Sequence, residues 1–197
     1  MTLNRVEETG VYYLYDYIPK RLFSSYSEEA VNITKSIWNY KNCEINELKK
    51  YSNELLRAII ELCSDTTAEK IALVAIPPSK VNKSAAMRIT IWNICLWSQN
   101  GDITQEFSFQ KSFLDYSKLL MRNESVPASH EGRRIGAEEQ SETISCCAKK
   151  LDDDLLYILL DDVTTTGTIM GVSAEKLITS GVSEDHIIKL ALAKTVR

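Results

Sequence analysis

Two adjacent carboxylates and a row of hydroxyls stand together in the segment "YILLDDVTTTGTIM", residues 157–170. Four apolar residues lead directly into Asp161 and Asp162, and loop 164–168 then places four threonines around Gly167. Glycine allows the backbone to turn so that successive N–H groups converge, and a following helix adds the positive end of its dipole. Loop 164–168 is therefore predicted to bind one phosphate group.

The two aspartates indicate what carries that phosphate. Carboxylates repel a nearby phosphate unless another group lies between them, and a ribose can do so, because its 2′- and 3′-hydroxyls donate hydrogen bonds to carboxylates. A magnesium ion bridging nearby oxygens would relieve the remaining repulsion. The loop lacks the GxxxxGK[ST] pattern of nucleoside-triphosphate loops, so a ribose 5-phosphate moiety is favoured. The simpler alternative is that Asp161 and Asp162 cap the loop at an ordinary helix start.

The segment "YILLDDVTTTGT" resembles the phosphoribosyl-diphosphate (PRPP) binding motif of the type I phosphoribosyltransferases, with its apolar strand, two acidic residues and Thr/Gly loop. The resemblance implies that Asp161 and Asp162 hold the ribose hydroxyls. It implies Mg²⁺ as the cofactor, bound by the same two aspartates either directly or through an intervening group. It further implies that the 5′-phosphate is bound by Thr164, Thr165, Thr166, Gly167 and Thr168.

A second resemblance lies in "AIPPSK", residues 75–80, which follows the buried-strand pattern "KIALVAI". It is similar to the "VPxP" segment of the ComF-like branch, and less similar to the Lys-Gly loops of purine-salvage enzymes. The resemblance implies a diphosphate-binding loop, with a lysine as its cation and prolines in an unusual peptide geometry. The loop residues are Pro77, Pro78, Ser79 and Lys80. A plain strand-ending turn with a surface lysine is the alternative.

The third element is the polar segment "RNESVPASHEGRRIGAEEQSE", residues 122–142. A loop of that length is uncommon inside a compact domain unless it is functional or disordered. In the family a mobile loop at this place closes over the reacting centre, excludes water and brings positive charge to the departing diphosphate. The candidate catalytic residues are Arg122, His130, Arg133 and Arg134. The orotate-type loop is richer in lysine, so which cation acts stays open, as does a solvated loop without a role.

The implied reaction is displacement of magnesium diphosphate from C1 of PRPP by a nucleobase or related nucleophile. The chain would be a phosphoribosyltransferase, a glycosyltransferase of the pentosyltransferase class, acting in nucleotide metabolism. Thr165 stands where purine-salvage relatives usually carry an aspartate, which disfavours hypoxanthine or guanine as acceptor. Two alternatives stay open. One is a non-catalytic PRPP- or nucleotide-binding protein of the same fold, acting as a sensor or system component, and the other is a different sugar-phosphate α/β protein.

The elements that must position these residues alternate between strand and helix from residue 70 onward. Strands are predicted over "KIALVAI", "TISCCAK", "LLYILL" and "HIIKLALAKTV", with helices over "KSAAMRITIWNICLWSQNG" and "GTIMGVSAEKLITSG". The stretch "FSFQKSFLDYSKLLMR" is compatible with strand or helix. The expected fold is α/β: a type I phosphoribosyltransferase-like open, mainly parallel sheet flanked by helices, over residues 67–197.

Residues 1–66 are predicted to form an N-terminal helical segment and a candidate base-recognising hood. Helices are expected over "SYSEEAVNITKSIWNYK", with a capping box at Ser25 and Glu28, and over "INELKKYSNELLRAIIELC". The tyrosine-rich "VYYLYDYIP" is expected to line either a base pocket or a subunit contact, so a homodimer stays open.

Composition excludes several functional classes. The 197 residues are 44% apolar and 25% charged, as expected for one globular domain. The net charge of −4 disfavours general nucleic-acid binding. No apolar run approaches the roughly 20 residues that span a bilayer, and no secretory signal is recognisable, so no membrane association is expected. Five irregularly spaced cysteines without a CxxC pattern predict reduced thiols and a cytoplasmic location.

Overall fold

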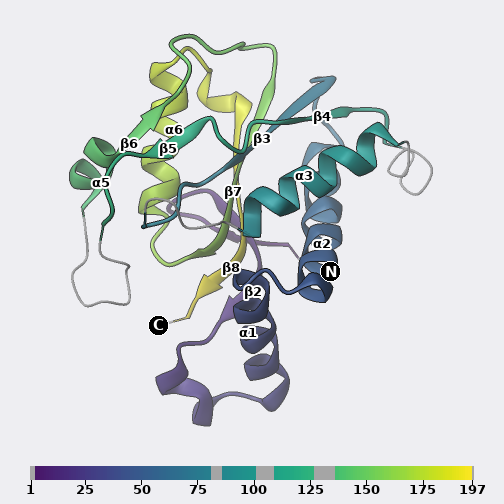
Figure 1. Cartoon of the computed structure of the whole chain (residues 1–197), viewed down its shortest axis with the longest axis vertical. Helices are drawn as coiled ribbons and strands as arrows, with labels where there is room; N and C mark the ends of the chain where they lie inside the picture. Colours follow the sequence, from purple (N-terminus) through teal and green to yellow (C-terminus); the bar gives the residue numbers. More distant parts are fainter. Residues whose placement is uncertain (1–2, 81–85, 101–108, 127–135, 197) are drawn as a thin grey trace.

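The computed structural model describes residues 3–80, 86–100, 109–126 and 136–196, and its centre is a six-stranded sheet (Figure 1). The sheet has the order β1-β2-β8-β7-β3-β4, in which only the β1–β2 pair is antiparallel. The strands of this sheet are β1 (Asn4–Val6), β2 (Val11–Tyr17), β3 (Lys70–Ala75), β4 (Ser112–Asp115), β7 (Leu156–Thr164) and β8 (Ile187–Thr195). The expected α/β fold with a mainly parallel sheet flanked by helices is thus confirmed.

Helices and a small second sheet cover the central sheet. The helices are α1 (Glu28–Lys41), α2 (Ile45–Cys63), α3 (Ala86–Gln99), α5 (Ala137–Thr143) and α6 (Thr168–Thr179), with the 3₁₀ helices η1 (Lys20–Ser25) and η2 (Glu184–His186). The second sheet pairs β5 (Leu120–Arg122) with β6 (Ile144–Cys146) in antiparallel register. In Figure 1, α2 and α3 lie on one side of the central sheet, while α5, α6, β5 and β6 lie on the other.

Each face of the central sheet has its own hydrophobic core, because successive side chains of a strand point to opposite faces. On β3 and β7, Leu73 and Leu160 pack with α1, α2 and α3, whereas Val74 and Leu159 pack with α6. All four of these side chains are fully buried. The continuous apolar runs of the sequence therefore correspond to strands that are covered on both faces.

The chain changes direction across the sheet between β3 and β7. From β3 the chain passes through α3 to β4 on one flank, whereas β7 pairs with the other flank of β3. Helices α3 and α6, which follow these two central strands, lie on opposite faces of the sheet. In open α/β sheets, ligands bind at the carboxyl ends of strands at such a switch point.

The predicted N-terminal segment is not wholly helical, because its first part forms β1 and β2. Strand β2 pairs in parallel with β8, so that Tyr13 lies opposite Ala191. Aromatic residues favour strands, and the tyrosine-rich sequence of β2 becomes a strand because β8 offers a partner. The predicted helix start was also displaced: helix α1 begins at Glu28, and its N-cap is Ser27, whose hydroxyl accepts a hydrogen bond from the amide of Ala30.

Two further predictions of secondary structure needed correction. The polar segment 122–142 was expected to be a loop, yet its end forms α5, and the strand expected over "TISCCAK" is reduced to β6. The ambiguous stretch before it contains strands β4 and β5. Strand β7 continues past Leu160 through both aspartates to Thr164, because its pairing with β8 extends to Lys194.

Candidate functional site

The two loops that the sequence singled out leave the sheet side by side at the switch point. Ala75, the last residue of β3, lies opposite Leu160 of β7, and the amide of Ile76 donates a hydrogen bond to the carbonyl of Leu160 at 2.9 Å. Loop 77–80 therefore begins beside Asp161. Loop 164–168 follows the same strand β7 and leads into α6. The acidic pair thus lies between the two loops along this edge.

Loop 164–168 is held in shape by its own hydrogen bonds and by one left-handed residue. Gly167 is the N-cap of α6 with a φ of 78°, a conformation that favours glycine. Its amide donates to the buried hydroxyl of Thr164 at 3.2 Å. A Cβ atom at Gly167 would lie 3.2 Å from the side chain of Thr9 in the β1–β2 turn. Both the backbone conformation and this neighbour therefore require glycine.

The same loop presents hydrogen-bond donors at the start of a helix. The first amides of a helix have no acceptor within it, and the amide of Thr166 has no hydrogen-bond partner among the described residues. The hydroxyls of Thr166 and Thr168 lie 2.8 Å apart, and that of Thr165 lies 3.3 Å from the hydroxyl of Thr195 at the end of β8. This arrangement can bind a small anion of the size of one phosphate.

Asp161 and Asp162 are partly buried, and their two negative charges repel each other. Oδ1 of Asp161 accepts the amide N–H of Asp162 at 2.8 Å. Burial, and after it the neighbouring charge of Asp162, raises the pKa of Asp161 to about 7, although Lys41 and the amide of Asp162 act in the opposite direction. Burial and the charge of Asp162 therefore both oppose ionisation of Asp161.

Lys41 is a residue of this site that sequence reasoning missed. It ends α1, and its Nζ lies 3.0 Å from Oδ1 of Asp162, with both side chains 31% exposed. Burial acts to lower the pKa of Lys41, but the charges of Asp162 and Asp161 more than offset it, and the pKa is raised. A helix C-terminus also favours a cation. No local pattern could have revealed this contact, because it joins residues 121 positions apart.

An aromatic corner from the N-terminal segment lies near the same edge. Strand β2 ends at Tyr17, opposite Thr195, so its carboxyl end lies on the site edge. The indole N–H of Trp38 donates a hydrogen bond to the Tyr17 hydroxyl, and Phe23 stacks on Trp38 with ring centroids 5.6 Å apart. The Tyr17 side chain also contributes, weakly, to the raised pKa of Lys41. Elements of the expected hood therefore reach the acidic pair.

Arg122 lies away from the position expected for it. Instead of belonging to a solvent-facing closing loop, it ends β5 and is only 6% exposed. Its Nε donates to the carbonyl of Pro78 at 2.7 Å, and its other nitrogens donate to Oγ1 of Thr143 at 2.7 Å and Oε1 of Gln140 at 3.0 Å. Burial lowers the pKa of this guanidinium. Its position is fixed by these three acceptors, and it holds loop 77–80 in place.

The rest of loop 77–80 is anchored from the same side. The amide of Val126 donates to the carbonyl of Ser79 at 2.8 Å, while Lys80 is exposed. No cis peptide bond occurs in the described residues, so the expected unusual geometry at Pro77 and Pro78 is not found. The other candidate catalytic residues, His130, Arg133 and Arg134, lie outside the described residues.

The two aspartates would provide part of a binding site for the expected magnesium ion. Among the described residues, no group of three or more histidine, cysteine, aspartate or glutamate side chains is arranged to hold a metal. Asp161 and Asp162 supply two carboxylates, of which one is already paired with Lys41. Mg²⁺ is commonly bound by one or two carboxylates together with substrate phosphates. The residues therefore fit a magnesium ion that a phosphorylated substrate helps to hold, and do not form a complete site on their own.

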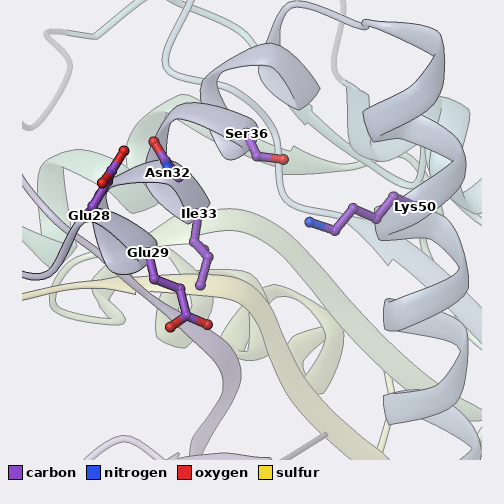
Figure 2. A pocket seen from close by; sticks show the side chains of 6 residues that line it. All are labelled: Glu28, Glu29, Asn32, Ile33, Ser36 and Lys50. Atoms are coloured by element: carbon purple, nitrogen blue, oxygen red, sulfur yellow. The ribbon is translucent and has the colours of Figure 1, made fainter.

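A separate pocket lies between the first half of α1 and the start of α2, with a volume of about 460 Å³ (Figure 2). Its lining side chains are Glu28, Glu29, Asn32, Ile33, Ser36 and Lys50. Of the α1 residues in this lining, Ser36 comes nearest in sequence to Lys41, five positions before it, or about 7 Å along the helix axis at 1.5 Å per residue. Neither aspartate and no residue of loops 77–80 and 164–168 lines this pocket, so it is distinct from the edge that carries the aspartates.

No protein-family model matches the chain, and no curated protein matches its sequence. Within the described part of the chain, every helix is too short or too polar to span a bilayer. All five cysteines are free thiols, and Cys63 and Cys95 are buried. The function is therefore inferred from the site itself.

Proposed function

We propose that this protein is a Mg²⁺-dependent phosphoribosyltransferase with a type I phosphoribosyltransferase-like fold, which binds PRPP and transfers its ribose 5-phosphate to a nucleophile. The observation that supports it most is the order of groups along the switch-point edge. Loop 164–168, the pair Asp161–Asp162 and loop 77–80 follow one another there. The 5′-phosphate, the ribose hydroxyls and the diphosphate follow one another in the same order in PRPP.

Each part of the ligand would then meet a group of suitable chemistry. The 5′-phosphate would accept hydrogen bonds from the amides and hydroxyls at the start of α6. The ribose hydroxyls would donate to Asp161 and Asp162, which separate the phosphate from the diphosphate. The diphosphate would lie against loop 77–80, where Lys80 brings a positive charge.

Most of the catalysis in this proposal comes from positioning and electrostatics. Bound magnesium would supply positive charge that stabilises the departing diphosphate, held by Asp161 and Asp162 either directly or through an intervening group. Arg122 would act as a positioning residue, since its guanidinium holds the carbonyl of Pro78. The aromatic corner of Tyr17, Phe23 and Trp38 would border the acceptor, in the role of the hood.

The expected setting follows the same proposal. The protein would act in the cytoplasm, in keeping with its five free thiols. A nucleobase or related acceptor would be its second substrate, and a homodimer stays a prediction. Thr165 disfavours an acceptor of the hypoxanthine or guanine type on the resemblance described above.

A second candidate function is PRPP or nucleotide binding without transfer, as in a sensor or a component of a larger system. One observation favours it: Arg122, the candidate catalytic residue that the structure describes, is buried and bonded to three acceptors. A buried guanidinium held in this way is not available to follow a departing diphosphate. Catalysis would then depend on cations from elsewhere in the chain.

One experiment separates these functions. The protein is mixed with PRPP and Mg²⁺ and a panel of purine, pyrimidine and pyridine bases, and diphosphate release is followed while calorimetry measures PRPP binding. Release with one acceptor supports transfer. Binding without release across the panel supports the sensor, and the absence of binding contradicts both functions. Asp154→Asn, at an exposed aspartate, serves as a matched control for substitutions of the acidic pair.

A further inference from the structure

Lys41 belongs to the N-terminal segment, yet it is fixed on the acidic pair of the central sheet. Its Nζ contacts Oδ1 of Asp162 at 3.0 Å, and the backbone that carries it is the last residue of α1. Helix α1 is itself anchored beneath, since Ile37 and Tyr40 are fully buried in the core shared with the sheet. The ammonium group is therefore held on Asp162 by a packed helix.

The contacts of the two carboxylates leave one oxygen of each aspartate for a ligand. Oδ1 of Asp161 accepts the amide of Asp162, and Oδ1 of Asp162 accepts Lys41. No described residue donates a hydrogen bond to Oδ2 of either aspartate. A carboxylate oxygen accepts hydrogen bonds from hydroxyls, so each of these Oδ2 atoms can accept one from a ribose hydroxyl.

Lys41 affects both the orientation of the Asp162 carboxylate and the repulsion between the two aspartates. A charge-assisted hydrogen bond to Oδ1 restricts rotation of the Asp162 carboxylate, so that Oδ2 keeps one orientation. Two neighbouring carboxylates also repel each other, and a cation on one of them reduces that repulsion. Without Lys41, the Asp162 carboxylate could rotate, and its Oδ2 would no longer keep the one orientation in which it accepts from a ribose hydroxyl.

We propose that Lys41 is a positioning residue that acts through Asp162 and sets the affinity of this edge for the ribose diol. The inference rests on the proposed function, since it takes Asp161 and Asp162 as the ribose ligands. It goes beyond that function because it gives helix α1 a role in binding the ribose, in addition to any role of the N-terminal segment in binding the acceptor. Lys41 need not leave when the sugar binds, because it occupies Oδ1 and the sugar uses Oδ2.

The test compares two probes in calorimetry, ribose 5-phosphate and inorganic phosphate. Phosphate reports on loop 164–168 alone, so the ratio of the two dissociation constants reports on the ribose contacts. A partly exposed ion pair contributes up to about 1 kcal/mol, and so Lys41→Met should lower the preference for ribose 5-phosphate about fivefold. Lys41→Arg keeps a cationic donor and should restore the ratio to within about twofold.

Two controls distinguish positioning from a general effect on the fold. Lys35→Met removes an exposed lysine from the same helix and should leave the ratio unchanged. In an Asp162→Asn background, Lys41→Met should have little further effect, because the two residues act as one unit. A loss of helix packing, or a loss of general positive charge, would weaken the binding of both probes equally.

The outcomes separate this inference from the function on which it rests. A lowered ratio in Lys41→Met, restored in Lys41→Arg and absent in the Asp162→Asn background, supports the positioning role. If the parent protein prefers ribose 5-phosphate and Lys41→Met keeps that preference, the role of Lys41 is wrong and the proposed function stands. If the parent protein binds ribose 5-phosphate no better than phosphate, the assignment of the ribose ligands is wrong, and the inference about Lys41 is wrong with it.

Discussion

The Nζ atom of Lys41 lies 3.0 Å from Oδ1 of Asp162, across 121 positions of the sequence. This ion pair joins the last turn of α1 to the edge of β7 where the two aspartates lie. Because the same edge also receives the end of β2, residues 1–66 contribute directly to the candidate site. These residues therefore do more than flank the core: β2 is a strand of the central sheet, and Lys41 contacts Asp162.

Replacement of both aspartates, Asp161→Asn with Asp162→Asn, should weaken PRPP binding at least tenfold. Hydrogen bonds to charged groups contribute about 1.5–3 kcal/mol each, and amides accept more weakly than carboxylates. The fold should survive, because the change also removes repulsion between neighbouring charges. Calorimetry with PRPP and thermal melts followed by circular dichroism measure the two effects. Unchanged affinity in the double variant, with Asp154→Asn as control, would refute the assignment of the ribose contacts.

Gly167→Ala should lower both stability and phosphate affinity. The residue has a φ of 78°, which costs an alanine about 1–2 kcal/mol. Its Cβ would also lie 3.2 Å from the side chain of Thr9. Urea denaturation measures the stability, and phosphate titration measures the binding.

Gly171→Ala is the matched control for that substitution. Gly171 is inside α6, and a Cβ there meets no atom within 4 Å. Alanine is a better helix former than glycine, so this variant should gain about 0.5–1 kcal/mol. Combining Gly167→Ala with Thr9→Gly, which removes every side-chain atom of Thr9 near the new Cβ, should recover only the part of the loss that comes from the contact. Equal effects of the two glycine substitutions would contradict the special role of Gly167.

Arg122→Met should destabilise the protein by about 2–3 kcal/mol, because it leaves three acceptors without their buried donor. Loop 77–80 loses its anchor at Pro78, so PRPP binding should weaken as well. Chemical denaturation gives the loss of stability, and Lys118→Met removes an exposed cation from the same region as a control. A solvent-facing catalytic arginine would instead affect diphosphate release and leave the free energy of unfolding unchanged.

The cysteines should differ sharply in reactivity towards a thiol reagent at pH 8. Burial raises the pKa of Cys63 and of Cys95 to about 12, from an ordinary value of 9.0, whereas Cys147 is exposed. The thiolate is the reactive form, so Cys147 should be labelled first and the two buried thiols only after unfolding. Peptide mass spectrometry identifies the labelled residues.

The same shifts set the sign of a pH effect on stability. Well below pH 9 both buried thiols are neutral in the folded and in the unfolded chain, so they contribute no pH dependence there. Above pH 9 the unfolded chain loses these protons first, and the free energy of unfolding should fall as the pH rises towards 12. Cys63→Ala with Cys95→Ala should lessen that fall. An equal slope in the parent and in this variant would show that other groups cause it.

The sequence by itself determined the features whose information is local. The apolar runs of β3, β7 and β8 identified buried strands, and loop 164–168 could be recognised because its glycine and threonines are contiguous. The helix expected over the sequence of α2 was also correct, and its buried face includes Leu48, Tyr51, Leu55 and Ile59, while Leu62 at its end is only partly buried. The type I phosphoribosyltransferase resemblance and its PRPP chemistry stay predictions.

Only the tertiary structure decided the features that depend on distant partners. The tyrosine-rich N-terminus became β2 because β8, at the far end of the chain, pairs with it. Arg122 became a buried anchor because Pro78 and the residues of α5 surround it, and Lys41 entered the site because α1 packs beneath Asp162. The physical reason is the same in each case. A sequence pattern records which side chains are apolar and at what spacing, whereas pairing and ion contacts depend on which segments fold against one another.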